Sequence, residues 1–189
     1  KCQKIIENNG GDYTHDIVNN GTITAWVDTI ANNSGGSITG GITNNLGATI
    51  SGFHAILNGS SWTIPSLGHI SSIYNAGSII GFNQNVNGSA DEFLSILNTG
   101  TINEITNVGS IYAGRNTAIS YGIRNIGSIT TLSNLQGAGN ANGALTHKGN
   151  LPTNYNVIVN SSTVYGKLTG VSISADTMTF DIDSTSQVD

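Results

Sequence analysis

Isoleucines recur along the chain in pairs, and each pair encloses a short polar stretch of the same type. The unit reads Ile-x-Asn-x-Gly-[Ser/Thr]-Ile, and it alternates apolar and polar positions as half-buried strands do. Intact copies span residues 17–23, 73–79, 96–102, 105–111 and 123–129, copies lengthened by two residues span 30–38, 42–50 and 56–64, and frayed copies begin at Ile6 and Leu132. The pattern predicts short β-strands separated by corners.

The spacing of these units favours a solenoid over a meander of hairpins. Strand and corner repeating in register describe coils that stack on one another at about 4.8 Å. Two units per coil would give coils of roughly 18 to 30 residues, with extra length as loops. We therefore expect an all-β fold of the parallel β-helix type.

Each part of the unit has a mechanical interpretation. The branched isoleucines suit inward positions on short strands, and Asn stacked on Asn can pass amide hydrogen bonds from coil to coil as a ladder. Asn and Gly tolerate positive φ, so we expect them to turn the chain at the corners. The corner residues of the intact copies are Asn19, Gly21, Asn75, Gly77, Asn98, Gly100, Asn107, Gly109, Asn125 and Gly127.

The repeat divides the chain into two parts. Residues 1–146 are expected to form the β-solenoid. Residues 147–189 lose the repeat but keep period-two stretches at 164–168, 171–173 and 178–182, which predict a C-terminal β cap or a less regular continuation of the solenoid. The interruption at 81–93 predicts a protruding loop, and 113–121 is a second loop candidate.

Composition excludes several classes of protein. Charged residues make up 9% of the chain, against about 25% in an average soluble domain. Stacking explains the scarcity, because equivalent residues of successive coils face one another and like charges would repel. A formal charge of −5 with six scattered cations gives no footprint for nucleic acid. The single Cys2 excludes an intramolecular disulfide, and no apolar run is long enough for membrane insertion as a helix.

The tandem units resemble the β-strand repeats in passenger regions of bacterial autotransporters, the type V secreted surface proteins. Residues 145–168 resemble the segment that follows such repeats in large proteobacterial surface proteins of this type. The resemblance covers nearly the whole chain. It implies a right-handed parallel β-helix, export across the outer membrane, and an extracellular place at the bacterial outer surface.

Residues that could carry chemistry are few and scattered. Asp91 and Glu92 are adjacent inside the expected loop, and a strand would direct them to opposite faces. Asp181 and Asp183 share a strand face, but no calcium-loop motif surrounds them, so we expect both to be solvated. The histidines are far apart and lack metal-ligand spacing, so we expect them at the surface: His15, His54, His69 and His147. We expect no catalytic residue, no cofactor and no metal site.

Hydroxyl side chains flank the second isoleucine of each unit. If that isoleucine points inward, its neighbours point outward and form parallel rows on one face. Such a face resembles that of ice-binding proteins, although Pro65, Ile80, Asn103 and Tyr112 interrupt it. The residues of the possible outward face are Thr22, Thr24, Ser37, Thr39, Thr49, Ser51, Ser128 and Thr130.

These observations favour a non-enzymatic segment of a secreted cell-surface protein, acting as a rigid stalk or adhesin. Its partners would be a host or neighbouring-cell surface protein or glycan, or other copies of itself through self-association. Exposed aromatic residues are candidates for such contacts, and they are Tyr74, Phe82, Tyr112 and Tyr121. An ice-binding solenoid and a polysaccharide-active β-helix, of the lyase or tailspike kind, are the alternatives.

Overall fold

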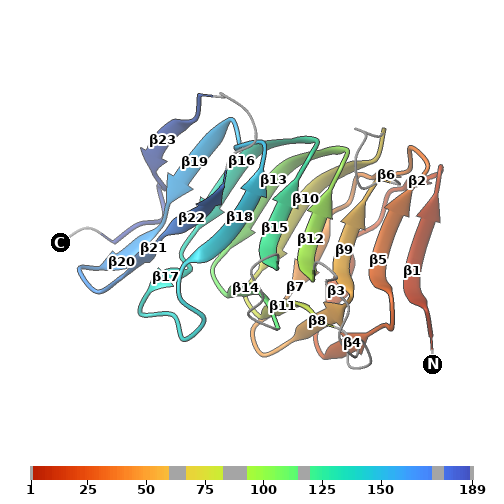
Figure 1. Ribbon diagram of the computed structural model, residues 1–189, viewed down its shortest axis with the longest axis horizontal. Coiled ribbons are helices and arrows are strands. Elements are labelled where there is room, and N and C mark those ends of the chain that lie inside the picture. Colours follow the sequence, from red (N-terminus) through yellow and green to blue (C-terminus); the bar gives the residue numbers. More distant parts are fainter. Residues whose placement is uncertain (1, 60–66, 83–92, 115–119, 172–176, 188–189) are drawn as a thin grey trace.

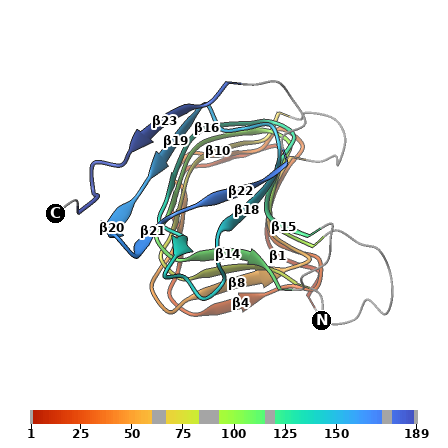
Figure 2. The ribbon, with the colours of Figure 1, turned by 60° about the vertical axis from the view of Figure 1, so that its left-hand side comes forward.

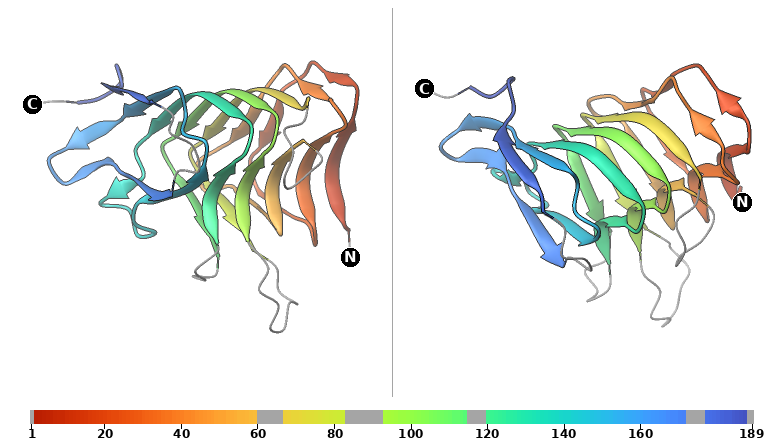
Figure 3. Two further views of the ribbon diagram at one scale, coloured as in Figure 1. Left: turned by 45° about the horizontal axis from the view of Figure 1, so that its top comes forward. Right: turned by 90° about the horizontal axis from the view of Figure 1, so that it is seen from above.

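The chain winds into a parallel β-solenoid of about six turns (Figure 1). The computed structural model describes residues 2–59, 67–82, 93–114, 120–171 and 177–187. None of the residues in these ranges is helical, and none of them belongs to a helix that could cross a membrane. The coils stand in a row along the long axis in Figure 3, with strands of successive coils side by side. The all-β parallel architecture expected from the repeat is confirmed.

Each regular coil contributes strands to three parallel sheets, which give the solenoid three sides (Figure 2). The first sheet contains β1 (Lys4–Asn9), β5 (Asp28–Asn33), β9 (His54–Asn58), β12 (Leu94–Asn98), β15 (Tyr121–Asn125), β18 (Leu145–Gly149) and β22 (Leu168–Val171). The second contains β2 (Asp12–Tyr13), β3 (Ile17–Asn19), β6 (Ser37–Ile38), β7 (Ile42–Asn44), β10 (His69–Asn75), β13 (Thr101–Asn107), β16 (Ser128–Asn134), β19 (Asn154–Val157) and β23 (Thr179–Ile182). The third contains β4 (Thr22–Thr24), β8 (Thr49–Gly52), β11 (Ser78–Gly81) and β14 (Ser110–Ala113).

The third sheet is shorter than the other two. It ends at β14, whereas the first and second sheets continue to β22 and β23. In place of further strands on this side, the chain forms a small antiparallel sheet of β17 (Gly137–Ala138), β20 (Val159–Ser161) and β21 (Val164–Gly166). The first two sheets therefore extend past residue 146, while the small antiparallel sheet forms the third side of the solenoid there.

Stacked isoleucines fill the interior. In the first sheet Ile30 pairs with Ile56, which pairs with Ile96 in the next coil, and all three are fully buried. The second and third sheets carry equivalent stacks, for example Ile73 on Ile105 and Ile79 on Ile111. Each fully buried isoleucine contributes about 1.5–3 kcal/mol to stability. The inward isoleucines expected from the sequence are thus the core.

The two loops expected at 81–93 and 113–121 lie for the most part outside the described residues, which exclude 83–92 and 115–119. Asp91 and Glu92 fall in the first of these gaps. Thr63, Ile64 and Pro65 of one lengthened unit also lie outside the described residues.

Candidate functional site

Two ladders of asparagine amides run through the solenoid. In the first ladder each Nδ2 atom donates to the Oδ1 atom of the asparagine in the next coil, at 2.7–2.9 Å, and the members are Asn8, Asn32, Asn58, Asn98 and Asn125. The second ladder repeats this bond at 2.8–3.0 Å through Asn19, Asn44, Asn75, Asn107 and Asn134. The two asparagines of each coil stand at different corners, so each coil holds two repeat units.

The ladder residues also close the corners in which they lie. Asn98, for example, donates to the carbonyl oxygen of Ser128 at 2.9 Å and accepts from the backbone N–H of Gly100 at 3.2 Å. A buried amide with this many partners holds both its own corner and the adjacent coil. Asparagine is required because it offers a donor and an acceptor on one short side chain.

The expectation of positive φ at the corners holds for the lengthened units, at Gly35, Gly47 and Gly59, and is wrong for the intact units. Among the described residues the only non-glycine with positive φ is Ser34, and none of the five glycines of the intact units has it. Steric space is the reason for glycine instead. A Cβ atom added at Gly77, Gly100, Gly109 or Gly127 would overlap a backbone carbonyl oxygen of the preceding coil. At Gly21, in the first coil, an added Cβ would meet nothing within 4 Å.

The outward hydroxyl residues do not form one face. Thr22, Thr49, Ser78 and Ser110 form one row in the third sheet. Ser37, Thr101 and Ser128 belong to another row in the second sheet, which His69 interrupts. Since each coil carries two units, their hydroxyls are divided between two sides of the solenoid.

The remaining residues of the possible face are divided in the same way. Thr24 and Ser51 continue beside Ile80 and Tyr112 in the third sheet, and Ser51 is only 9% exposed. Thr39 and Thr130 are both exposed and both belong to the side of the second sheet. Thr39 directly follows β6, and Thr130 lies within β16, directly after an inward residue. A continuous flat plane of hydroxyls is therefore absent from the described part of both sheets.

Two of the four histidines are buried, contrary to the expectation that all lie at the surface. The Nδ1 atom of His54 lies 2.7 Å from Oδ1 of Asp28, and both residues are buried in adjacent strands of the first sheet. Lys4 occupies the same register position in β1. This polar row joins three coils, and among the described residues no group of three histidine, cysteine or acidic side chains could hold a metal ion.

His147 occupies a position that belongs to isoleucine in the preceding coils. It pairs with Ile123 in the register of the first sheet and is 1% exposed. Burial lowers the pKa of His147 from its usual 6.5 to about 4, and a hydrogen bond with the backbone of Asn150 partly opposes the shift. Its Nε2 atom has no hydrogen-bond partner within the described residues. The imidazole is therefore a neutral core group at pH 7.

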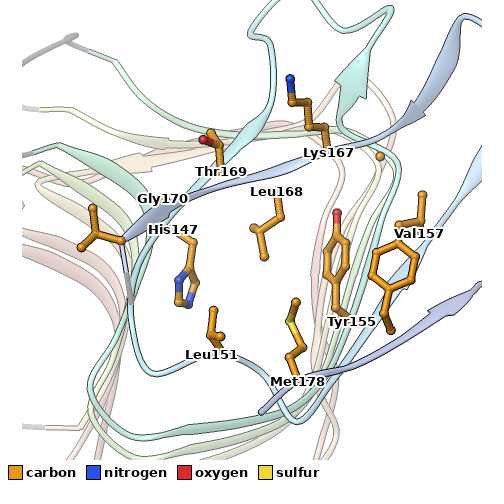
Figure 4. Close-up of a pocket in the computed structure, with 12 residues that line it drawn as sticks. His147, Leu151, Tyr155, Val157, Lys167, Leu168, Thr169, Gly170 and Met178 are labelled. Carbon is orange, nitrogen blue, oxygen red and sulfur yellow. The ribbon is translucent and has the colours of Figure 1, made fainter. Parts of the chain in front are cut away.

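A cavity of about 430 Å³ lies at this end of the solenoid. Leu168, Tyr155, Met178 and Leu151 surround it together with His147 (Figure 4). Tyr155 takes the place of the stacked isoleucines in the second sheet, and burial raises the pKa of its hydroxyl. The cavity is mostly apolar because it continues the hydrophobic core, and we interpret it as a part of the interior that side chains do not fill completely.

A second hollow, of about 390 Å³, lies beside the last strand of the third sheet. Neutral polar side chains line it, among them Ser120, Asn142, Thr146 and Thr169, together with the ring of Tyr112. Tyr112, one of the aromatic residues named from the sequence, lines this hollow. Tyr74 is 40% exposed on the second sheet, and Phe82 and Tyr121 are half-buried.

The sequence alone did not predict the burial of His147 and Tyr155 or the place of Asn142 at a hollow. For His147 and Tyr155 the position in the strand could have shown it, because an alignment of β18 and β19 with the preceding strands places them where the earlier coils have isoleucine or leucine. Asp181 is exposed as expected, and Asp183 accepts from the backbone and hydroxyl of Thr185 beyond β23. Both acids lie apart from the two hollows.

Comparisons of the chain with protein-family models, with curated proteins and with solved structures found no match.

Proposed function

We propose that this chain is a rigid, non-enzymatic segment of a secreted bacterial cell-surface protein, which holds binding surfaces away from the cell. The observation that supports the proposal most is the pair of continuous amide ladders, which tie every regular coil to the next at two corners. Repeat proteins of this kind are stabilised by contacts between neighbouring units. Bending such a rod at any coil would break buried hydrogen bonds.

The surface location rests on the resemblance of the repeat to autotransporter passenger regions. The scarcity of charged side chains in the coils supports a mechanical role. The hydroxyl rows are divided between two sheets, so they give no support to an ice-binding plane. The buried pair of Asp28 and His54 links two coils and gives no support to a polysaccharide-cleaving groove.

Labelling of intact cells tests the location. Antibodies raised against the folded segment should label unpermeabilised cells of the source bacterium as strongly as permeabilised ones, and mild external proteolysis should remove the signal. A periplasmic protein serves as the control, because it should be labelled only after permeabilisation. Labelling of this segment only after permeabilisation would overturn the proposal.

A further inference from the structure

The hollow beside Tyr112 exists because the third sheet stops. β14 pairs with β11 on one side, and Tyr112 has Ile80 as its neighbour in that register. On the other side, no strand of the described residues follows in this sheet. The chain after β16 covers the start of β14 instead, where Gln136 accepts from the N–H of Ile111 at 2.7 Å and Asn140 donates to the carbonyl oxygen of Gly109 at 3.3 Å.

This arrangement leaves the outward side of Tyr112 uncovered by a further coil. Its backbone is held on the inner side, because its carbonyl oxygen accepts from the buried Ser95 hydroxyl at 2.6 Å. Tyr112 is half-buried and lines the hollow, so its side chain has less freedom than a fully exposed one. Aromatic rings held in this way supply contact area at low conformational cost.

The described polar residues that line the hollow are all neutral. Thr146 accepts from the N–H of Gly122 at 2.8 Å, which fixes its oxygen and leaves its proton to donate elsewhere. Asn142 adds a side-chain amide, and Thr169 adds an exposed hydroxyl from the neighbouring strand β22. Together these groups offer both donors and acceptors around one aromatic ring.

We propose that the hollow beside Tyr112 is a binding site for a neutral carbohydrate. A sugar ring presents an apolar C–H face that packs on an aromatic ring, and hydroxyls that match neutral donors and acceptors. A volume of about 390 Å³ accommodates a small saccharide. This inference rests on the proposed surface role and specifies the adhesive contact that such a segment would make.

The lining also argues against a charged ligand. Among the described residues no acidic or basic side chain lines the hollow, so these residues offer an anion or cation no charged partner in exchange for lost hydration. Lys148 lies two residues beyond Thr146, and its Nζ atom stands 5.3 Å from the centre of the Tyr121 ring. That ammonium group is thus engaged over a different aromatic residue.

A glycan array of neutral oligosaccharides, with sialylated and sulfated versions of the same cores, tests the site. We expect binding to neutral cores. Tyr112→Ala should weaken it by about tenfold or more, because the stacking surface is lost. Tyr112→Phe keeps the ring and should retain most of the affinity, and Asn142→Ala should weaken binding by about three- to tenfold. Tyr74→Ala, on the exposed face of the second sheet, is the matched control and should bind as the unaltered protein does.

Three outcomes would overturn the carbohydrate site. They are binding to no glycan, binding to acidic glycans alone, and unchanged binding by Tyr112→Ala with its circular dichroism and melting curve preserved. The result is separable from that for the surface location, because labelling of intact cells does not depend on Tyr112. If antibodies label intact cells but the segment binds no glycan, the proposed stalk role stands and the proposed carbohydrate site is wrong.

Discussion

The regular coils and the last turn of the solenoid use the same sheets with different residues. In the regular coils the inward positions are isoleucine and the corners carry laddered asparagine. In the last turn, His147 and Tyr155 replace the isoleucines, and Gly149 and Val157 replace the asparagines. The backbone register continues, but the side-chain stacks do not. Parallel strand pairing therefore does not require the repeat. The repeat supplies the isoleucines that pack the interior and the asparagines whose hydrogen bonds connect the coils.

The ends of the two ladders show how the stacks stop. Asn125 donates to the backbone carbonyl of Asn150 at 2.8 Å, and Asn134 donates to the hydroxyl of Tyr155 at 3.2 Å. Each terminal amide is thus satisfied by an acceptor that does not continue the ladder. A buried amide without a hydrogen-bond partner is costly. Acceptors of this kind, which we call ladder terminators, therefore allow the repeat to end without destabilising the last regular coil.

The largest expected effect concerns the glycines of the regular coils. Gly127→Ala places a Cβ against the carbonyl oxygen of Gly100, and the nearest atoms all belong to the backbone of Gly100, which cannot move as a flexible side chain would. We expect a loss of about 3 kcal/mol or more in the free energy of unfolding, measured by urea denaturation. Gly21→Ala is the control, since it meets no neighbour and should change stability by less than about 1 kcal/mol. Equal losses in both variants would contradict the steric explanation.

A break in the middle of a ladder comes next. Asn98→Ala removes a buried amide that bonds Asn58, Asn125 and Ser128, and it leaves those groups without a partner. We expect a loss of about 2–3 kcal/mol in the free energy of unfolding. Asn8→Ala, at the more exposed first position of the same ladder, should cost less than about 1 kcal/mol. If the two substitutions cost the same, the ladder would not act through burial.

The histidine of the last turn should make stability depend on pH. The pKa of His147 is about 4 in the folded protein and near 6.5 when unfolded, so the unfolded chain binds the proton more tightly. Its stabilising contribution is complete above pH 6.5 and is lost as the pH falls toward 4. We expect a decrease of about 2 kcal/mol over this range, measured by urea midpoints.

His147→Ile restores the residue that the regular coils use and should remove most of this pH dependence. His15→Gln is the control, because His15 is exposed and its replacement should leave the pH profile unchanged. A profile for His147→Ile that matches the unaltered protein would assign the dependence to other groups.

The smallest effect is expected at the ladder terminator. Tyr155→Phe keeps the buried ring against Phe180 but removes the hydroxyl that accepts from Asn134. Since Asn134 keeps its bond to the carbonyl oxygen of Gln136, we expect a loss of only about 1 kcal/mol in the free energy of unfolding. Tyr165→Phe, at an exposed tyrosine, should be neutral in the same measurement. A neutral Tyr155→Phe would show that the ladder needs no terminator.

Much of the regular solenoid follows from local sequence. The period of the isoleucines predicts the strands, and the paired asparagines predict the ladders, because both depend on residues that repeat at equivalent positions. The role of the glycines in the intact units was misassigned because positive φ is a local property, whereas the collision that excludes a Cβ at Gly100 comes from Gly68 in another coil. The hydroxyl rows were placed on one face because spacing alone does not reveal which sheet a unit occupies.

The sequence by itself determined the class of the fold, the identity of the core residues and the low charge, since all three are consequences of stacking like on like. Only the tertiary structure decided where that stacking stops. It brought His54 against Asp28, buried His147 in a column of isoleucines, and ended the third sheet at Tyr112. The physical reason is that these contacts join residues of different coils, whose relative positions depend on loop lengths that the repeat does not encode.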